Sequence, residues 1–310
     1  MPANTTVPAV ISVDWGLSSL RCRLVDKGGA IIESRKSGNG ISAIAHRNFR
    51  DALLAGVGSW IAAHPGVPVL LSGMIGSRLG WIEAPYVACP AGLAEIGAAL
   101  LPLDVAGLPN AFIVPGVKLS TQERADIMRG EECEVLGCLV VPSSRAALYI
   151  APGTHSKWIA VRDDRIASFT TIMTGELFSL LSGSSSLAGT MAAPSADDAS
   201  FLEGVSVARQ AAPRGGVLPL LFGIRADGVL GRRSPPELRS LLSGLLIGSE
   251  LAHGLAGEPE GDLLIVGDDR LAGHYQLALS ESFGRPSRRG PSVAASLGHL
   301  AIVRQLGLTP

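Results

Sequence analysis

The segment AVISVDWGLSSLRCRLVDKGGAIIESRK, at residues 9–36, contains three runs of strand-forming residues separated by two turns. The first run is rich in β-branched residues and ends at Asp14, and a turn of small and hydroxyl residues follows at 16–19. Gly28 and Gly29 are typical of the second, tight hairpin turn. The segment therefore predicts a three-stranded meander at the start of the chain.

The segment AALYIAPGTHSKWIAVRDDRIASFTTIM, at residues 146–173, has the same order of strands and turns. Gly16 and Gly153 are 137 residues apart, and so are Asp26 and Asp163, so the two copies align without a gap. Strand content alone would make any two hairpins look alike, but here the turns share their chemistry as well. We therefore predict a duplicated α/β fold.

The remainder of the chain predicts helices that alternate with buried strands. Helical spacing is found at 49–63, 127–138, 238–255, 271–283 and 293–306. Short apolar runs indicate strands at 67–71, 111–115 and 263–266. The segment 182–200 is rich in Ser, Gly, Ala and Pro, and we expect it to be a mobile loop.

The length and composition indicate a globular protein with two lobes. A chain of 310 residues exceeds the ordinary size of one domain. Its content of 47% hydrophobic and 17% charged residues excludes a disordered protein. The net charge of −1 provides no global field that would hold nucleic acid, so we expect no nucleic-acid partner.

Every long apolar segment is broken by Gly, Pro or a charge well before the roughly 18 residues that a membrane span needs. Residues 1–8 carry no basic residue and no signal-type apolar core. We therefore expect a cytoplasmic protein that has no membrane partner. The four cysteines are scattered without a CxxC pair, and we expect them to be reduced and buried.

Glycine turns of this kind can hold a phosphate tail, because backbone N–H groups that lack neighbouring side chains can approach phosphate oxygens. Each charge-assisted hydrogen bond contributes roughly 1.5 to 3 kcal/mol. In the first copy, Asp14 lies beside Gly16 and Ser18, where its carboxylate could hold Mg2+ directly or through water. The alternative role for Asp14 is that of a structural turn former.

The second turn, at 152–157, contains no carboxylate but offers backbone donors, two hydroxyls and a cation. It suits a phosphate cradle, whereas the first turn suits a metal site. Lys157 would supply the cation, although a lysine that opens a strand is often only solvated. Two such turns would hold a phosphate tail from both sides.

A charged cluster at 126–134 leads into an apolar helix. Phosphoryl transfer to a hydroxyl needs a base near that hydroxyl, and an acidic residue of this cluster could supply it. Acidic residues at a helix start are also common partners of the helix dipole. The planar guanidinium of Arg129 would suit either the carboxylate of an acidic substrate or a neighbouring glutamate.

Two further glycine-containing segments follow predicted buried strands. The first, at 72–81, contains three glycines and Trp81, and we expect it to face a ligand. The second, at 265–270, joins a strand to a helix through Gly267 and offers a place for a nucleotide base or ribose.

Six segments taken together resemble one known family. They are DWGLSSLR at 14–21, SGMIGSRLGW at 72–81, APYVACPA at 84–91, IMRGEE at 127–132, PGTHSKW at 152–158 and MTGELF at 173–178. In this order they are similar to the 2-dehydro-3-deoxygalactonokinases. The resemblance implies an actin/hexokinase-like (ribonuclease H-like) fold, in which two βββαβα lobes close around a cleft that holds Mg-ATP. It also implies transfer of the γ-phosphoryl group to the 6-hydroxyl of 2-dehydro-3-deoxy-D-galactonate, in galactonate catabolism.

The resemblance also implies which residues form each lobe and which motifs each lobe contains. Residues 1–140, joined by the C-terminal helix at 292–310, would form the sugar-acid lobe with the first phosphate motif. Residues 141–291 would form the lobe with the second phosphate motif and the adenosine motif. The partners would be a small sugar acid and ATP, with Mg2+ as the metal, and the sequence leaves open whether the chain forms a homodimer.

The resemblance further implies roles for single residues. Glu131 would be the catalytic base, with Glu132 and Asp126 as alternatives, and Asp14 would hold the metal. The residues around the phosphates would be Gly16, Ser18, Ser19, Gly153, Thr154, His155, Ser156 and Lys157. Gly267 would lie at the adenosine. The sugar-acid pocket would contain Ser77, Arg78, Trp81, Arg129 and Glu176.

The chain departs from the family pattern at two places. Asp268, Asp269 and Arg270 stand where small or hydroxyl residues are usual, and they would put negative charge near a nucleotide. Glu134 stands where glutamine is usual. Two alternatives follow: a kinase of another sugar or sugar acid on the same fold, or a regulator that binds a sugar acid and a nucleotide without turnover.

Overall fold

The computed structural model describes residues 7–191, 197–256 and 261–308, and the chain divides into two compact units. The first unit contains Met1–Ala147, Ile159–Phe169 and Gly290–Pro310, and the second contains Leu148–Trp158 and Thr170–Arg289. Compactness does not show that a unit folds independently. The expected lobes, 1–140 with 292–310 and 141–291, therefore stay a prediction.

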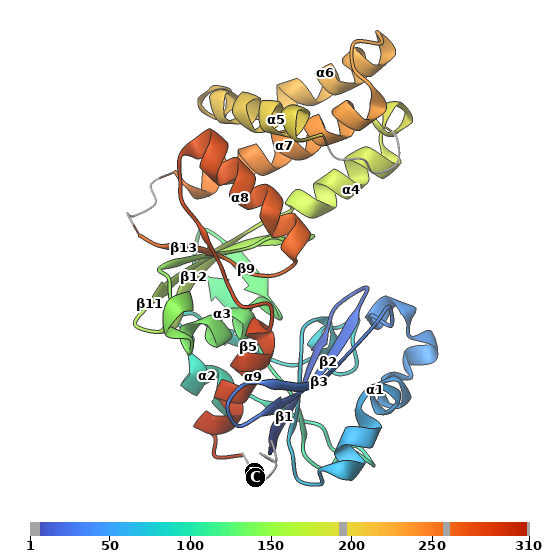
Figure 1. The fold of residues 1–310 in the computed structure, drawn as a ribbon, viewed down its shortest axis with the longest axis vertical. Helices are drawn as coiled ribbons and strands as arrows, with labels where there is room; N and C mark the ends of the chain where they lie inside the picture. The colour runs from blue at the N-terminus through green and yellow to red at the C-terminus, as the bar shows by residue number, and fades with distance from the viewer. Residues whose placement is uncertain (1–6, 192–196, 257–260, 309–310) are drawn as a thin grey trace, which may run out of the picture. The chain divides into compact units, whose positions relative to one another are not determined.

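The first unit is built on a six-stranded sheet with the order β3-β2-β1-β4-β7-β6, of which β1, β2 and β3 are labelled in Figure 1. Its strands are β1 (Pro8–Trp15), β2 (Leu20–Asp26), β3 (Ile31–Ser37), β4 (Val69–Ser72), β6 (Leu101–Pro102) and β7 (Ala111–Ile113). The first three form the expected antiparallel meander, and β4 runs parallel to β1 and to β7. Residues 9–13 of β1 are buried without interruption, as expected for a strand covered on both faces.

Helices pack on both faces of this sheet. Helix α1 (Phe49–Ala63), which matches the expected range, packs on the face to which Ile11 and Val13 point. Ser12 points to the opposite face, where its hydroxyl bonds to Ser296 of α9 (Ala294–Gln305). The alternation of side chains along β1 thus separates two layers of core.

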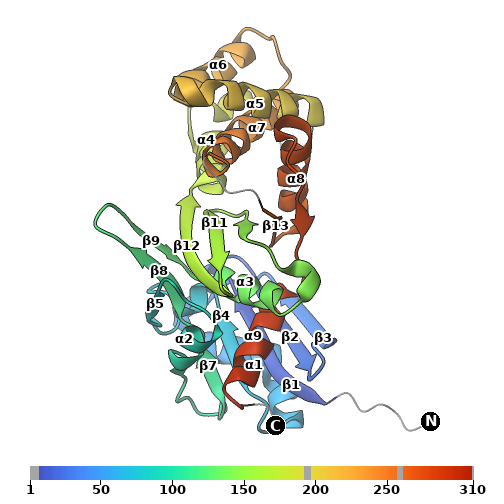
Figure 2. The same ribbon diagram turned by 90° about the vertical axis from the view of Figure 1, so that its left-hand side faces the viewer.

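The C-terminal helix α9 lies against α3 (Glu131–Leu139), as Figure 2 shows. A Cβ atom on Gly137 would lie 1.8 Å from the carbonyl oxygen of Ala294, and one on Gly298 would lie 2.0 Å from that of Cys133. Glycine is therefore required where these two helices cross. The last helix of the chain is part of the core of the first unit.

A smaller sheet in the first unit has the order β5-β8-β9. Its strands are β5 (Tyr86–Ala88), β8 (Gly116–Ser120) and β9 (Ala125–Met128). The prediction of a helix from residue 127 was wrong, because Ile127 and Met128 pair with β8. Gly130, with φ 117°, then turns the chain, and the helix begins at Glu131. The unit also contains α2 (Leu93–Ala98) and the short 3-10 helices η1 (Ile41–Ala43), η2 (Ala45–Arg47), η3 (Met74–Gly76) and η4 (Pro142–Ser144).

A second large sheet has the order β12-β11-β10-β13-β14. Its strands are β10 (Leu148–Ala151), β11 (Ser156–Arg162), β12 (Arg165–Ile172), β13 (Leu263–Ile265) and β14 (Arg288–Arg289). The boundary between the units passes through β11 and β12. Strand β13 runs parallel to β10 and to β14, just as β4 runs parallel to β1 and to β7. The duplication expected from the 137-residue offset is confirmed in the strand order.

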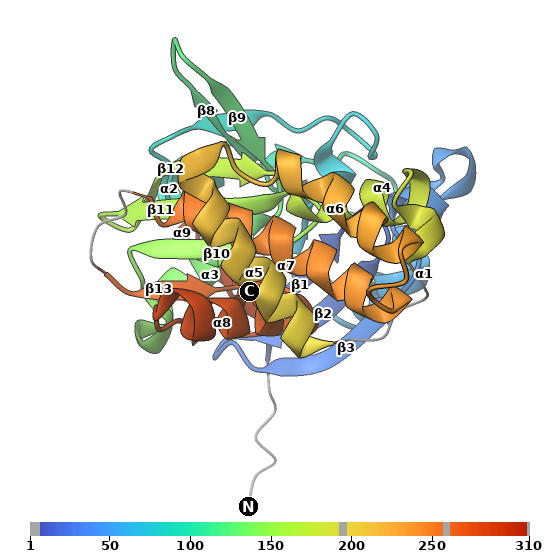
Figure 3. The same ribbon diagram turned by 90° about the horizontal axis from the view of Figure 1, so that it is seen from above.

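The second unit carries five helices among its described residues. They are α4 (Thr174–Ser184), α5 (Asp198–Ala211), α6 (Leu218–Val229), α7 (Pro235–Gly254) and α8 (Asp269–Phe283). Figure 3 shows α5 lying across α7. A Cβ atom on Gly244 would lie 2.0 Å from the carbonyl oxygen of Phe201, so this crossing also depends on glycine.

The expectation of a mobile loop over 182–200 was wrong for the described part of that segment. Helix α4 continues to Ser184, a 3-10 turn η5 covers Ala188–Thr190, and α5 begins at Asp198. Leu187 is buried in a core cluster with Leu238 and Ile224, and this burial outweighs the weak local helix propensity. Residues 192–196 lie outside the described residues.

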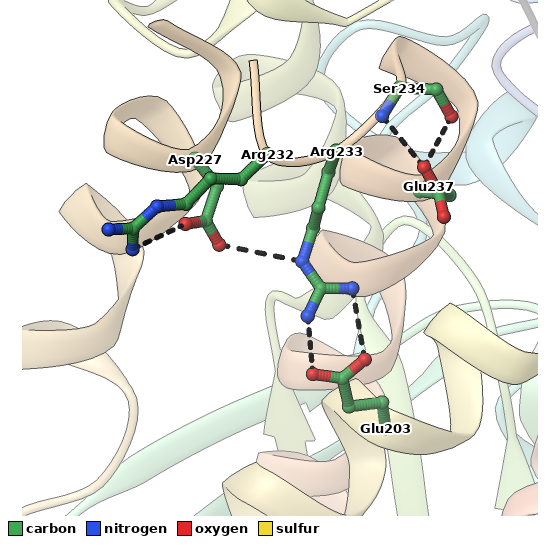
Figure 4. Close-up of polar contacts among 6 residues, drawn as sticks. All are labelled: Glu203, Asp227, Arg232, Arg233, Ser234 and Glu237. Carbon is green, nitrogen blue, oxygen red and sulfur yellow. Dashed lines mark hydrogen bonds and ion pairs between the residues drawn. The ribbon is translucent and has the colours of Figure 1, made fainter. Parts of the chain in front are cut away.

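Ion pairs fix the turn between α6 and α7 (Figure 4). The guanidinium of Arg233 makes two hydrogen bonds to the Glu203 carboxylate, at 2.5 and 2.9 Å, and its Nε lies 3.4 Å from Asp227 Oδ2. Ser234 then begins α7 in a capping box with Glu237. The network joins α5, α6 and α7.

Within the described parts of the chain, no helix combines the length and the apolar character that crossing a membrane requires. All four cysteines are free. Three of them are buried as expected, namely Cys22, Cys133 and Cys138, but Cys89 is only half-buried.

Candidate active site

The carboxyl ends of β1 and β4 meet at one edge of the first sheet. Asp14 of β1 is paired in register with Ser72 of β4. Gly73 follows with φ 87°, and a Cβ atom on it would lie 2.9 Å from Trp15 O and 3.6 Å from Asp14 Oδ1. A Cβ atom on Gly130 would lie 3.3 Å from the Cα of Gly73. The start of α3 therefore joins the two strand ends, at the edge where open α/β sheets bind ligands.

Asp14 is half-buried at this edge, and its Oδ2 accepts a hydrogen bond from Arg21 Nη1 at 3.1 Å. Burial raises the pKa of Asp14, while the guanidinium groups of Arg21 and Arg23 oppose this shift. The two arginines thus favour the ionised form of Asp14, against the effect of its burial.

Three glutamates occupy the first turn of α3. Glu131 is half-buried, and its Oε2 accepts a hydrogen bond from the Arg129 N–H at 3.2 Å. Glu132 is fully buried, and both of its carboxyl oxygens lie within 2.8 Å of the Gly130 amide nitrogen. Burial raises the pKa of Glu132 to about 8, and burial with the nearby charge of Asp14 does the same for Glu134. The raised pKa values of Glu132 and Glu134 favour their protonated forms at neutral pH, which leaves Glu131 as the candidate base of this turn.

The first glycine turn is supported by a glycine on another segment. Gly16 N–H donates to Ser19 O at 2.9 Å, which closes the turn. A Cβ atom on Gly40 would lie 2.3 Å from Leu17 O, and the Ser42 N–H donates to that oxygen at 3.1 Å. The segment 40–42 therefore packs closely against the turn and stabilises it.

The second glycine turn has the same support. A Cβ atom on Gly175, at the start of α4, would lie 2.3 Å from Gly153 O. The next amide, of Glu176, donates to Thr154 O at 2.9 Å. Gly153 N–H lies 3.4 Å from the Oγ of the buried Ser156. The duplication thus includes the element that holds each turn, as well as the turn itself.

A cavity of about 690 Å³ lies in the second unit and begins at this second turn. Its size suits a small ligand. Its lining residues combine aromatic and apolar groups with two arginines and two aspartates. They are Gly153, Thr154, Thr174, Gly175, Phe178, Asp197, Asp198, Phe201, Arg239, Ser240, Ser243, Ile247, Arg270, Leu271, His274 and Tyr275.

The residues that depart from the family pattern occur next to this cavity. Gly267, with φ 94°, brings its loop to within contact of the second turn, since its Cβ would lie 3.7 Å from Pro152 O. Asp268 caps α8 by accepting hydrogen bonds from the Arg270 and Leu271 amides at 3.1 Å. Asp269 pairs with Arg289 at 2.6 Å. Each carboxylate therefore has a partner within the protein, and its effect on a nucleotide stays a prediction.

Comparison with known proteins places this architecture in a family. A family model described as 2-keto-3-deoxy-galactonokinase matches residues 14–301. The chain belongs to the 2-keto-3-deoxy-galactonokinase family. It is 38% identical over 283 residues to a probable 2-dehydro-3-deoxygalactonokinase of Rhizobium meliloti (strain 1021), covering 89% of this chain and 90% of the relative. It is 36% identical over 244 residues to the 2-dehydro-3-deoxygalactonokinase of Escherichia coli (strain K12), covering 78% of this chain and 79% of the relative.

Solved structures agree with this membership. A crystal structure assigned as a 2-dehydro-3-deoxygalactonokinase from Sinorhizobium meliloti has a TM-score of 0.85 at 34% identity, covering 96% of this chain and 99% of that one. The activator of 2-hydroxyisocaproyl-CoA dehydratase from Clostridium difficile shares the fold alone, with a TM-score of 0.53 at 11% identity, and coverage of 97% and 95%. The expected actin/hexokinase-like fold is confirmed, and this galactonokinase-family chain is a phosphotransferase.

The structure also shows where the other predicted catalytic and phosphate-binding residues lie. Asp126 lies on β9, where its carboxylate accepts the Ile127 N–H at 2.8 Å, and it does not lie on the first turn of α3. Lys157 is buried rather than solvated, and its Nζ donates to His155 O at 3.0 Å. The His155 ring bonds to Glu176, so Glu176 lies beside the second turn. Ser18 and Ser19 lie on the first turn as expected.

The predicted sugar-acid residues of the first unit are engaged with their own loops. The Ser77 hydroxyl donates to Met74 O at 2.7 Å, and Arg78 pairs with Glu83 at 3.1 Å. Trp81 stacks on Phe49 with ring centroids 6.5 Å apart. The Arg129 guanidinium lies over the Tyr86 ring, and its Nη2 donates to Ala84 O at 2.8 Å, while its buried Nε and Nη1 have no partner among the described residues. These contacts do not unite the four side chains in one pocket, so their role in substrate binding stays a prediction.

Three features of the candidate site could not be recognised from the sequence: the aromatic wall of the cavity, Glu250 and the role of Gly175. The aromatic wall of the cavity comes from α4, α5 and α8, which have no shared motif. Glu250 is a lone acid on the apolar face of α7, between Leu246 and Leu251, and this position was the available signal. Gly175 is part of the family-like segment MTGELF, but its contact with the second turn depends on the tertiary structure.

The described residues contain no group of three or more His, Cys, Asp or Glu side chains arranged to hold a metal ion. A single carboxylate such as that of Asp14 is enough for Mg2+, because this ion usually keeps several waters and binds one or two carboxylates together with substrate phosphates. The residues present therefore fit a metal that arrives with a nucleotide.

Replacing Gly175 with alanine is expected to lower kcat/KM for ATP by on the order of 100-fold, because the new methyl group would displace the backbone of the second turn. Gly183→Ala is the matched control on the same helix, since nothing lies within 4 Å of its Cβ position. The control should keep kcat/KM and gain a little thermal stability. Equal kinetics for the two variants would show that the turn tolerates displacement.

The raised pKa of Glu132, about 8, predicts a pH dependence of stability. Between about pH 5 and 8 the folded state holds a proton that the unfolded state has lost, so the free energy of unfolding falls as the pH rises. Glu132→Gln, which does not titrate, should reduce this fall by on the order of a few kcal/mol in urea denaturation at several pH values. Glu237→Gln is the control, because hydrogen bonds to Ser234 lower the pKa of Glu237 and its titration lies below this range. An unchanged slope in Glu132→Gln would contradict the prediction.

Proposed function

We propose that the chain transfers the γ-phosphoryl group of ATP to the 6-hydroxyl of 2-dehydro-3-deoxy-D-galactonate. Membership of the galactonokinase family supports the substrate class. The observation that carries the proposal is the pair of glycine turns built in the same way, one beside a carboxylate cluster and the other at the mouth of a cavity.

The second unit suits the nucleotide. A purine and its ribose would occupy the 690 Å³ cavity among Phe178, Phe201 and Tyr275. From there the phosphates would extend over the second turn, whose amides can donate to them. The arginines of the lining, Arg239 and Arg270, would balance the charge of the nucleotide.

The first unit suits the transfer itself. The acceptor hydroxyl would lie at Glu131, which takes its proton as the oxygen forms a bond to the γ-phosphorus. The bond between that phosphorus and the β,γ-bridging oxygen breaks, and ADP leaves with the electron pair. Asp14 would hold Mg2+, which when bound neutralises charge on the phosphates.

The carboxylate of the substrate needs a cation in the first unit. Arg129 is our candidate, because two of its buried guanidinium nitrogens lack partners among the described residues, and such groups are costly to leave unpaired. Ser77, Arg78 and Trp81 belong to the neighbouring loop, and we propose that they complete the pocket. We place the activity in the cytoplasm, where ATP is supplied, and leave a homodimer as a prediction.

The test is a coupled ADP-release assay with the purified chain, ATP and Mg2+ over several aldonic and 2-keto-3-deoxy acids. We expect the highest kcat/KM with 2-dehydro-3-deoxy-D-galactonate, and a product phosphorylated at the 6-position. A preference for another sugar or sugar acid would identify a different kinase on this fold. Binding of ATP and sugar acid without any ADP release would favour the regulator.

A further inference from the structure

The carboxylate of Glu250 is buried on α7 and is only 2% exposed. It accepts hydrogen bonds from three side chains on three different elements. Trp158 Nε1 of β11 donates at 2.9 Å, the Tyr275 hydroxyl of α8 donates at 2.6 Å, and the Thr174 hydroxyl of α4 donates to the same oxygen as Tyr275. One side chain therefore ties together four elements of the second unit.

The hydrogen bonds continue from Glu250 to the second glycine turn. The Tyr275 hydroxyl lies 3.1 Å from the Oγ of Ser156, which is fully buried. Ser156 Oγ in turn lies 3.4 Å from the Gly153 N–H. The orientation of the turn is thus linked to Glu250 through two buried hydroxyls.

The same partners form part of the cavity wall. Thr174 and Tyr275 line the cavity together with Gly153 of the turn, whereas Glu250 does not line it. A change at Glu250 would therefore reach the cavity and the turn only through these partners.

Packing alone does not account for a glutamate at this position. Burial raises the pKa of Glu250, and the hydroxyl and indole donors oppose that shift. A buried carboxylate is costly, and an apolar residue of similar volume is often at least as stabilising. The neighbours Leu246, Ile247 and Leu251 show that α7 otherwise presents apolar side chains here.

We propose that Glu250 is a positioning residue that fixes the second glycine turn relative to the nucleotide cavity. It acts through Tyr275 and Ser156 on the turn and through Thr174 and Tyr275 on the wall. The amides of the turn then meet the phosphates while the base is held in the cavity. This inference rests on the proposed function, because it assigns the cavity to the nucleotide.

The test compares the affinity of a non-hydrolysable ATP analogue with that of adenosine by calorimetry. Tyr275→Phe keeps the ring on the cavity wall and removes the hydroxyl, and Glu250→Gln keeps the shape but offers an N–H2 group in place of one acceptor oxygen. We expect each variant to bind the ATP analogue at least 10-fold more weakly and adenosine within about threefold of the wild type. The double variant should bind the ATP analogue no more weakly than the single variant with the lower affinity, because both changes break the same chain of hydrogen bonds.

Glu203→Gln is the matched control, since it removes a carboxylate from the Arg233 network of the same unit without touching the cavity lining (Figure 4). It should lower thermal stability and leave both affinities unchanged. Equal weakening of adenosine and the ATP analogue, or wild-type affinities in Tyr275→Phe, would overturn the role of Glu250. Failure of the wild-type chain to bind either ligand would instead overturn the assignment of the cavity. If Glu250→Gln does not fold, Tyr275→Phe decides the question, because it leaves Glu250 with two of its donors.

Discussion

Glu131→Gln is expected to lower kcat by about 10²- to 10⁴-fold, while the KM for ATP stays within about threefold. Glu131 is a half-buried acid in the first turn of α3, whereas Glu132 is fully buried against the Gly130 amide. Glutamine keeps the size of the side chain and cannot accept the proton of the substrate hydroxyl. Steady-state kinetics with 2-dehydro-3-deoxy-D-galactonate would measure the effect.

Glu132→Gln serves as the matched control for this prediction. With a pKa of about 8, Glu132 is largely protonated at pH 7, and an amide resembles that form. The control should therefore retain kcat within a few-fold at pH 7. A large loss in Glu132→Gln with normal turnover in Glu131→Gln would exchange their roles, and a large loss only in Asp126→Asn would move the base to β9.

Asp14→Asn is expected to lower kcat by about 10²- to 10³-fold and to raise the Mg2+ concentration needed for half-maximal rate. The carboxylate lies at the shared edge of β1 and β4 and accepts a hydrogen bond from Arg21. The amide keeps the volume but removes the charge that would attract the metal. Kinetics over a magnesium titration, with circular dichroism to confirm folding, would measure both effects.

Asp26→Asn is the control for Asp14 in the same meander. Its Oδ1 accepts hydrogen bonds from the Gly28 and Ala30 amides, and an asparagine oxygen can keep these bonds. The control should behave as wild type in the magnesium titration. If Asp14→Asn were active but less stable, Asp14 would be only a structural turn former.

The duplicated meander could be predicted because it depends on local chemistry. β-branched runs and glycine turns recur at a fixed offset, and each is specified by residues that are adjacent in the chain. The same holds for α1, whose apolar spacing gave its bounds as 49–63. Helix α3 was predicted to begin too early because Ile127 and Met128 are apolar in either structure, and only their pairing with β8 decides between strand and helix.

The candidate site could be predicted only in part, for the same reason. Asp14 lies at the end of a strand, and Gly16 and Gly153 lie in the turns that follow strands, so their sequence context reveals them. The cavity wall cannot be found in this way, since Phe178, Phe201 and Tyr275 come from separate helices that meet only in the folded unit. The partners of Asp268 and Asp269 could not be predicted either, because they are the first amides of α8 and Arg289 of a strand distant in the sequence.

The glycine crossing of α3 and α9 bears on how the chain acquires its structure during translation. Helix α9 is synthesised after the second unit, yet it packs against β1, which is synthesised well before that unit. Until α9 is present, Ser12 and the α3 face around Gly137 lack their native neighbours. All residues of the second unit, which ends at Arg289, are synthesised before α9. The acid cluster on α3 should therefore become ordered only after α9 has been synthesised.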